Sequence, residues 1–319
     1  MHDFPPDRPR HFGALALAVV VFFSSSCGGG IRPTLTDERL GDAAAIAAAP
    51  TAVAPTIAST AEPAETAQAA VSETGAGEPV MVDGVEQLVV QVIEEFPHDG
   101  LAYTQGLELL DGAFIESTGQ RPSSPSTLRR VVPQTGEVIQ SVATPNGYFG
   151  EGATVVGDQI IQLTWQTNTA YYWDATTFEL RKEVAYAGEG WGLCYDGARL
   201  IMTDGGTELI FRDPASFDEI GRIAVSFRGQ PVAQLNELEC VNGVVWANIY
   251  PSRTIVRVDP ASGMVTGIVD TSAINPNVAL DSEHAMNGIA WDAATSSFFV
   301  TGKFWPTLYR INFVPPTPG

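Results

Sequence analysis

The sequence has few of the residues that make metal sites. Its 319 residues include four histidines and three cysteines, and none of them forms the closely spaced pair that a tetrahedral zinc site uses. His2 and His11 lie close to the N-terminus, whereas His98 and His284 each stand alone. This distribution argues against a zinc hydrolase.

Basic residues are also scarce. Seventeen Lys and Arg stand against 37 Asp and Glu, so the formal net charge is −20 and the pI is near 4.4. A chain without a basic face cannot neutralise phosphates, which excludes a typical nucleic-acid-binding protein. Apolar residues are plentiful by contrast. The chain is 45% hydrophobic and has 15 Phe, 8 Tyr and 6 Trp, which is enough for a sizeable core.

Residues 1–27 have the pattern of an export signal. Two arginines precede an apolar run, Phe12–Phe23, whose 12 residues are too few to span a bilayer, since about 20 are needed. Small residues and Cys27 follow, which resembles the cleavage site of bacterial lipoproteins, where the cysteine becomes the acylated first residue. An ordinary secretory signal is the alternative, because Ser24 occupies the position where such sites usually have leucine. Both patterns predict an exported protein, either a cell-envelope lipoprotein or a secreted one.

Residues 28–84 have the composition of a flexible tether. Fifteen of the 37 residues from Ala43 to Pro79 are alanine, and no aromatic residue occurs between Phe23 and Phe96. Without large apolar groups, such a stretch cannot offset the entropy lost on ordering its backbone. We therefore expect the folded domain to comprise residues 85–319.

Within residues 85–319, short β-branched and aromatic runs alternate with turn signals, which is typical of an all-β protein. Similar turns recur four times, at 133–136, 174–177, 213–216 and 259–262. A second kind of turn recurs five times, at 110–112, 156–158, 195–197, 241–243 and 291–293. The two series define five units of roughly 40–50 residues, the period of four-stranded propeller blades.

The fifth unit lacks its outer strand, because Pro315 and Pro316 follow Leu308–Phe313. An unpartnered strand, Gln87–Glu94, precedes the first unit. We expect this strand to pair with the last blade and close the ring, which would remove exposed sheet edges. The predicted fold is a five-bladed β-propeller. Six blades are the alternative, if one repeat is too degenerate to recognise.

Glycines and polar residues gather where the first strand of each unit begins, and in a propeller these positions converge on the central channel. Taken singly, such segments are more often turns or core packing than a site. The segments are, in chain order, FPHDGLAYTQGL, YFGEG, LTWQ, GEGWGL, LNELE, WANIY and GKFWP.

Together these seven motifs resemble the plant and bacterial type of glutaminyl cyclase, the glutamine cyclotransferase family, from Phe96 to Val314. The resemblance implies a five-bladed propeller and an acyltransferase that converts an N-terminal glutamine to pyroglutamate with release of ammonia. It implies no required cofactor and no metal in the chemistry, and it leaves open a structural metal in the central channel. The implied partners are peptides or proteins with N-terminal glutamine, and the expected state is a monomer.

The resemblance also assigns the site residues. It places the acidic catalyst at Glu151, which we expect to shuttle a proton. We expect Lys303, one of only two lysines in the chain, and Asn236 to donate to the developing oxyanion. The implied substrate-binding residues are Gln105, Phe149, Trp165, Trp191 and Trp246.

Two further points stay open at the level of sequence. Cys194 and Cys240 either form a disulfide, as an exported protein permits, or remain buried free thiols. The main functional alternative is a non-catalytic propeller that binds peptide ends or sugars. A propeller lactonase or dehydrogenase is disfavoured, because the sequence has no Asp-rich calcium loop.

Overall fold

The computed structural model describes residues 79–121, 124–275 and 281–317, and most of these residues lie in β-strands. These ranges belong to one unit, Ala69–Gly319. Their only helical element is a short 3-10 turn, Pro145–Gly147, and no helix in them is long and apolar enough to cross a membrane. The predicted export signal with Cys27, and the predicted tether up to residue 78, lie outside the described residues.

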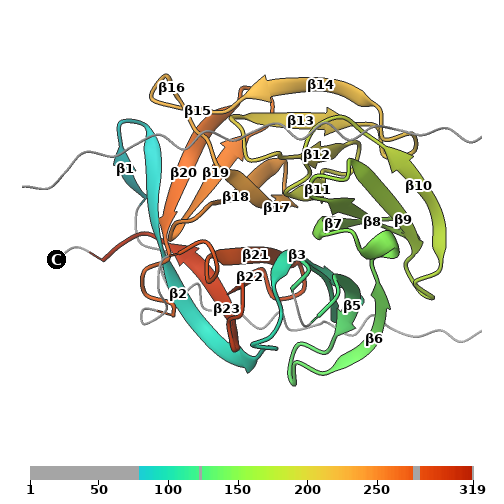
Figure 1. Cartoon of the computed structure of the whole chain (residues 1–319). Coiled ribbons are helices and arrows are strands. Elements are labelled where there is room, and N and C mark those ends of the chain that lie inside the picture. The colour runs from blue at the N-terminus through green and yellow to red at the C-terminus, as the bar shows by residue number, and fades with distance from the viewer. Residues whose placement is uncertain (1–78, 122–123, 276–280, 318–319) are drawn as a thin grey trace, which may run out of the picture. The chain divides into compact units, whose positions relative to one another are not determined.

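Three separate sheets have four antiparallel strands each, in chain order (Figure 1). The first sheet contains β3 (Thr104–Leu110), β4 (Ala113–Thr118), β5 (Thr127–Val131) and β6 (Val138–Ala143). The second contains β7 (Gly150–Val156), β8 (Gln159–Thr164), β9 (Thr169–Asp174) and β10 (Leu180–Ala185). The third contains β11 (Leu193–Tyr195), β12 (Leu200–Met202), β13 (Glu208–Arg212) and β14 (Glu219–Ala224).

The remaining strands form one larger sheet. Its main path runs through β17 (Leu235–Val241), β18 (Val244–Ile249), β19 (Thr254–Asp259), β20 (Met264–Asp270), β2 (Val85–Pro97), β23 (Thr307–Val314), β22 (Ser297–Gly302) and β21 (Met286–Asp292). Three short strands attach to it, namely β1 (Val80–Val82), β15 (Ser226–Phe227) and β16 (Gln230–Pro231). The first strands contact one another in a closed cycle, β3 to β7, β11, β17, β21 and back to β3. This all-β arrangement is consistent with a propeller.

The strand β2 joins two parts of the larger sheet. It pairs antiparallel with β23, from Val89 opposite Val314 to Pro97 opposite Thr307. On its other side it pairs in parallel with β20. The predicted pairing of the N-terminal strand with the last strand is therefore confirmed. Val80–Val82, which the sequence placed in the tether, forms strand β1 against β2.

The recurrent turns lie where the sequence predicted them, and aspartates close three of the four that join a third strand to a fourth. Asp174 Oδ1 accepts hydrogen bonds from the backbone N–H groups of Thr176 and Thr177 at 2.9 and 2.8 Å. Asp213 and Asp259 accept the equivalent bond from the residue two positions later. Such side-chain bonds to nearby backbone N–H groups stabilise a turn. They explain why aspartate marks the connection between the third and fourth strands.

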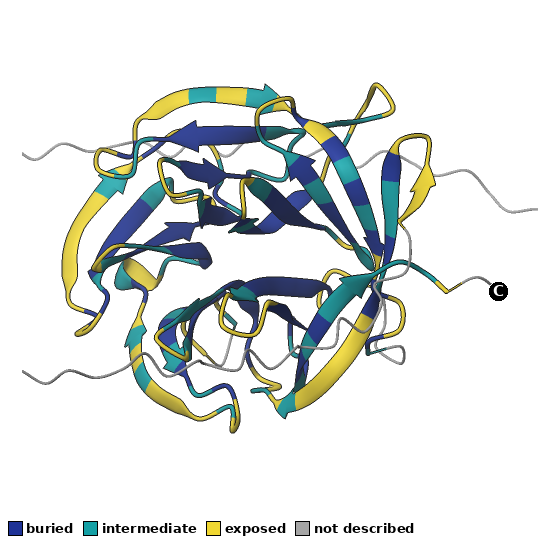
Figure 2. Ribbon diagram, turned by 180° about the vertical axis from the view of Figure 1, so that it is seen from behind, coloured by how far each residue is buried: buried dark blue, intermediate teal, exposed yellow. Residues whose placement is uncertain are grey.

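In each four-stranded sheet the first three strands are mostly buried and the fourth is mostly exposed (Figure 2). The fourth strands β6, β10 and β14 are mostly exposed, whereas β8 and β12 are almost wholly buried. The apolar core lies between neighbouring sheets. One cluster joins Tyr172 of the second sheet to Met202 of the third, and another joins Leu128 of the first to Tyr171 of the second.

Glycine lets the first strands approach closely. A methyl group on Gly152 of β7 would lie 2.6 Å from the carbonyl oxygen of Trp191, and one on Gly192 would lie 2.0 Å from the carbonyl oxygen of Asn236. No larger residue fits at either position. Gly152 of the YFGEG motif and Gly192 of the GEGWGL motif thus let the first strands bring the neighbouring polar residues into one region.

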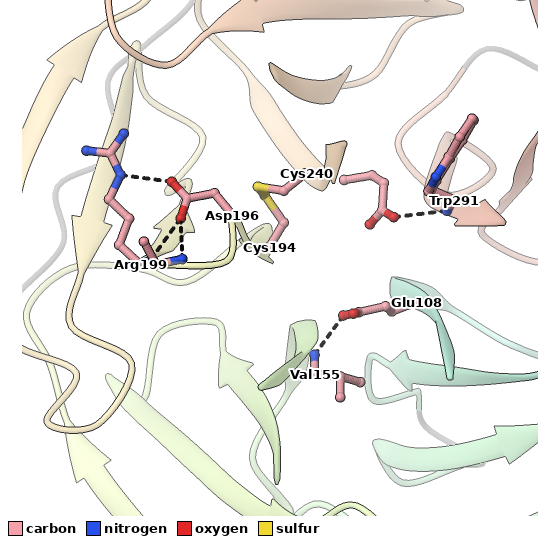
Figure 3. The surroundings of a disulfide bond; sticks show 9 residues. Glu108, Val155, Cys194, Asp196, Arg199, Cys240 and Trp291 are labelled. Atoms are coloured by element: carbon pink, nitrogen blue, oxygen red, sulfur yellow. Dashed lines mark hydrogen bonds and ion pairs between the residues drawn. A yellow bond between two sulfur atoms is a disulfide. The ribbon is translucent and has the colours of Figure 1, made fainter. Parts of the chain in front are cut away.

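Cys194 of β11 and Cys240 of β17 form a disulfide, with their Cα atoms 5.5 Å apart (Figure 3). Of the two alternatives left open by the sequence, the structure contains the bonded pair. The bond joins the first strands of two neighbouring sheets. Figure 3 also shows Glu108 of β3, which accepts a hydrogen bond from the backbone N–H of Val155 at 2.7 Å.

Candidate active site

A cavity of about 290 Å³ lies where the first strands begin and the second strands end. Seven of the eight predicted catalytic and substrate-binding residues line it, namely Gln105, Phe149, Glu151, Trp165, Trp191, Asn236 and Lys303. The other lining residues are Tyr103, Arg121, Tyr250, Ser282 and Glu283. The cavity therefore combines two carboxyl groups, a lysine, an arginine and two amides with aromatic walls.

Glu151 lies at the start of β7, and only 4% of its surface is exposed. Gln105 Nε2 donates a hydrogen bond to Glu151 Oε1 at 3.0 Å. Burial raises the pKa of Glu151 well above its ordinary value; Lys303 opposes this effect and Glu189 adds to it. A carboxyl group of this kind can both accept and return a proton near neutral pH.

Lys303 follows β22 and is 3% exposed. Its Nζ lies 4.6 Å from the ring centre of Tyr103 and 4.5 Å from that of Tyr250. Burial lowers the pKa of Lys303 to about 8, although the charge of Glu151 acts in the opposite direction. The ammonium group is thus held by two aromatic faces in the cavity and loses its proton at a modestly alkaline pH.

Asn236 of β17 is buried at the cavity, and its Oδ1 has no hydrogen-bond partner among the described residues. An unsatisfied buried amide oxygen costs free energy. A bound ligand with an N–H group would satisfy it. Its backbone oxygen is already used, since Thr203 Oγ1 donates to it at 2.8 Å.

The aromatic walls are held together by Glu189. Its Oε2 accepts hydrogen bonds from Trp165 Nε1 at 2.8 Å and from Trp191 Nε1 at 3.1 Å. Phe149 packs edge-on against Trp165, with ring centres 5.7 Å apart, and against Tyr103 at 6.0 Å. One carboxylate therefore fixes the orientation of two indole rings. Glu189 has no predicted role, because a carboxylate between two glycines is more often part of an exposed turn, and the family resemblance singles out only Glu151 from the two Gly-Glu-Gly segments.

Trp246, predicted as a substrate-binding wall, does not line the cavity. It lies within β18 and packs in the core, with its ring centre 4.7 Å from that of Phe313 and 5.3 Å from that of Phe298. Successive side chains of a strand point to opposite faces, and Trp246 lies on the face packed against the last strands. Tyr250, from the same WANIY motif but beyond the end of β18, lines the cavity instead and packs edge-on against Trp191 at 5.7 Å.

Five lining residues have no predicted role, and three of them come from loops. Arg121 stacks on the ring of Tyr103, with its guanidinium carbon 3.4 Å from the ring centre, and forms a 2.8 Å ion pair with Glu283. The hydroxyls of Tyr103 and Tyr250 both donate to the carbonyl oxygen of Ser282, at 3.3 and 3.4 Å. The two tyrosines lie within motifs that carry predicted residues, so proximity in sequence could have found them. No sequence signal marks the loop residues.

Three other carboxyl groups, buried in Glu237 and Glu239 and partly buried in Glu108, face neighbouring first strands rather than the cavity. Glu237 accepts hydrogen bonds from the backbone N–H groups of Leu107 and Ile289, at 3.2 and 2.7 Å. Glu239 accepts one from Trp291 at 2.9 Å, and Glu108 acts in the same way on β7. These bonds link one sheet to the next. Among residues 79–121, 124–275 and 281–317, no group of His, Cys, Asp or Glu side chains is arranged to hold a metal ion.

Comparison with known proteins gives consistent matches. Residues 59–313 match the family model described as glutamine cyclotransferase. A glutaminyl-peptide cyclotransferase of Arabidopsis thaliana is 38% identical over 229 residues, which cover 70% of this chain and 71% of that protein. The crystal structure of Myxococcus xanthus glutaminyl cyclase superposes with a TM-score of 0.68 at 38% identity, covering 72% of this chain and 99% of that chain. The residues matched by the family model include every residue that lines the cavity.

Proposed function

The chain belongs to the glutamine cyclotransferase family, and on that basis we propose that it converts the N-terminal glutamine of peptides and proteins to pyroglutamate with release of ammonia. The observation that supports this proposal most directly is the position of Glu151. Its carboxyl group is buried, accepts a hydrogen bond from Gln105 and lines the same small cavity as Lys303 and Asn236.

In the proposed reaction the substrate's neutral α-amine attacks the carbonyl carbon of its own side-chain amide. A C–N bond forms, and the five-membered ring closes in a tetrahedral intermediate. The Glu151 carboxylate accepts the proton that the attacking nitrogen loses. It then returns this proton to the amide nitrogen, the bond from that nitrogen to the carbonyl carbon breaks, and ammonia leaves. The attack is intramolecular, so the protein has to fix one substrate conformation rather than bring two molecules together.

The negative charge on the intermediate's oxygen needs donors. We assign this role to the ammonium group of Lys303 and to the Nδ2 group of Asn236. Donors fixed in a dry site stabilise an oxyanion more than water does, and removal of one typically costs about 10²–10³ in rate. Gln105 positions the carboxyl group of Glu151, and Phe149, Trp165 and Trp191 enclose the glutamine side chain and exclude water.

The mass of a peptide with N-terminal glutamine tests the proposal. Incubation with the full chain should lower the peptide mass by one ammonia, and a matched peptide with N-terminal asparagine serves as the control. Glu151→Gln keeps an oxygen that can accept the Gln105 bond but cannot shuttle a proton, so turnover should fall by about 10²–10⁴. An unchanged peptide mass with the wild type would favour the alternative of a non-catalytic binding protein. Full activity in a metal chelator is expected, because no proposed step uses a metal or cofactor.

We further propose that the strands form five blades. The three four-stranded sheets would be three of them, β17–β20 a fourth, and β21–β23 with β2 the fifth. The cycle of contacts among β3, β7, β11, β17 and β21 supports this count. A crystal structure that revealed a sixth unit would contradict it.

Export remains a prediction from the pattern of residues 1–27. We propose that the mature protein is a monomer in the cell envelope or outside the cell, attached through Cys27 if that residue is acylated. The disulfide supports export, because such bonds persist in oxidising compartments. Mass spectrometry of the mature N-terminus decides between a lipid-modified Cys27 and cleavage at another residue.

A further inference from the structure

Asn287 is a fully buried polar residue that does not line the cavity. It lies on β21, the first strand of the last unit. Its Nδ2 group donates two hydrogen bonds, one to Gln105 Oε1 at 2.8 Å and one to the backbone oxygen of Thr104 at 3.1 Å. Its Oδ1 has no partner among the described residues. Both of its side-chain hydrogen bonds are therefore directed at the segment that carries Gln105.

These bonds fix which end of each amide faces which neighbour. The oxygen of Thr104 belongs to the backbone and can only accept, so the Nδ2 end of Asn287 must face it. The same Nδ2 then requires the Oε1 end of Gln105 on its side. Gln105 consequently presents its Nε2 end to Glu151. A row of three hydrogen bonds thus transmits the fixed polarity of a backbone carbonyl to the proposed catalytic carboxyl group.

We propose that Asn287 is a positioning residue, which holds the amide of Gln105 so that it donates to Glu151 Oε1 and leaves the other carboxyl oxygen of Glu151 for proton transfer with the substrate. This inference rests on the proposed function for its catalytic meaning. The orientation of Gln105 itself does not depend on it.

Loss of the Asn287 donor should change the protonation of Glu151. A free Gln105 amide can turn and present its oxygen to the carboxyl group. An acceptor in this position favours the protonated acid, whereas a donor favours the carboxylate. The acid limb of the kcat–pH profile should therefore move to higher pH, by about one unit. A purely structural defect would lower kcat at every pH and leave the limb in place.

The test uses Asn287→Leu, which keeps the branched side-chain skeleton without a donor, and Asn287→Ala in case the first variant does not fold. Ile289→Val, a core truncation on the same strand, is the matched control. Gln105→Met supplies a double-mutant cycle, because the effect of Asn287→Leu should disappear when there is no amide to orient. Thermal unfolding monitored by circular dichroism verifies that each variant is folded.

A direct readout accompanies the kinetics. Carbon-13 NMR of labelled glutamates, with Glu151→Gln to assign the signal, measures the titration of Glu151 without turnover. We expect a higher midpoint in Asn287→Leu, no change in Ile289→Val and no further change in the Gln105→Met background. An unchanged midpoint in both Asn287 variants, or an equal shift in the Gln105→Met background, would overturn the inference. Absence of turnover in the wild type, with the titration shift present, would refute the proposed function and leave the positioning role of Asn287 intact.

Discussion

Lys303 should set the alkaline limit of activity. Burial lowers its pKa from a usual value near 10.5 to about 8, which corresponds to about 3 kcal/mol less favourable protonation inside the protein than in water. If the protonated amine stabilises the oxyanion, kcat/KM of the wild type should fall above about pH 8. The substrate's own amine cannot cause such a fall, because its deprotonation at rising pH promotes attack.

The informative perturbation is Lys303→Met, which keeps the length of the side chain and removes its charge. Two changes should appear together. The rate should fall by about 10²–10³, the usual effect of removing one oxyanion donor, and the remaining activity should have no decline near pH 8. The acid limb should move to higher pH as well, because Lys303 lowers the pKa of Glu151.

The assay is ammonia release from a peptide with N-terminal glutamine, with kcat and KM determined between about pH 5 and 10. Lys182→Met is the matched control. Lys182 is the only other lysine of the chain and lies on the exposed strand β10, so its loss should leave both limbs unchanged. Wild-type activity that stays constant to about pH 9.5, or a Lys303→Met variant that keeps the alkaline decline, would refute the assigned role.

Three further predictions concern residues outside the proposed proton path. Trp246→Ala should lower the free energy of unfolding by about 3–5 kcal/mol with little change in KM, whereas Trp165→Ala should raise KM with a smaller loss of stability. Replacement of Cys194 and Cys240 by alanine should cost about 2–4 kcal/mol, since the disulfide closes a 46-residue separation. Burial raises the pKa of Glu108 to about 7. Between about pH 5 and 7 the folded protein therefore keeps a proton on this carboxyl group that the unfolded chain has released. The free energy of unfolding should consequently fall as pH rises from about 5 to 8. Glu108→Gln should lessen that decline, because an amide does not titrate in this range. Its oxygen can still accept the hydrogen bond from the backbone N–H of Val155.

Urea unfolding across pH measures these stabilities, and peptide kinetics measure KM. A KM increase in Trp246→Ala with unchanged stability would place that indole in the cavity after all. Equal unfolding midpoints before and after removal of the cysteines would contradict a stabilising disulfide. A wild type and a Glu108→Gln variant with parallel pH profiles would show that another group titrates.

Much of the fold could be predicted because its signals are local. Asp174, Asp213 and Asp259 mark turns through bonds to residues two or three positions away, and such bonds need no knowledge of the rest of the chain. The pairing of β2 with β23 followed from an unpartnered strand at one end and a missing strand at the other. The sequence did not predict β1, because its three residues follow a long alanine- and proline-rich stretch and β2 is the strand with which they pair.

The site was harder to predict where side-chain direction matters. Motif membership placed Trp246 near the site, but the alternation of β18 turns it into the core, and Tyr250 takes the position instead. Arg121 and Glu283 meet across two loops 162 positions apart in the sequence, and neither loop has a pattern that reveals the partner. The role of Asn287 depends on which end of an amide faces its neighbour, and only coordinates contain that information.

The pairing of β2 with β23 has a consequence for biosynthesis. The two strands lie near opposite ends of the described region, so one edge of β2 stays unpaired until Thr307–Val314 is present and reaches it. A chain that ends before Thr307 would leave this edge free to pair with a strand of another molecule.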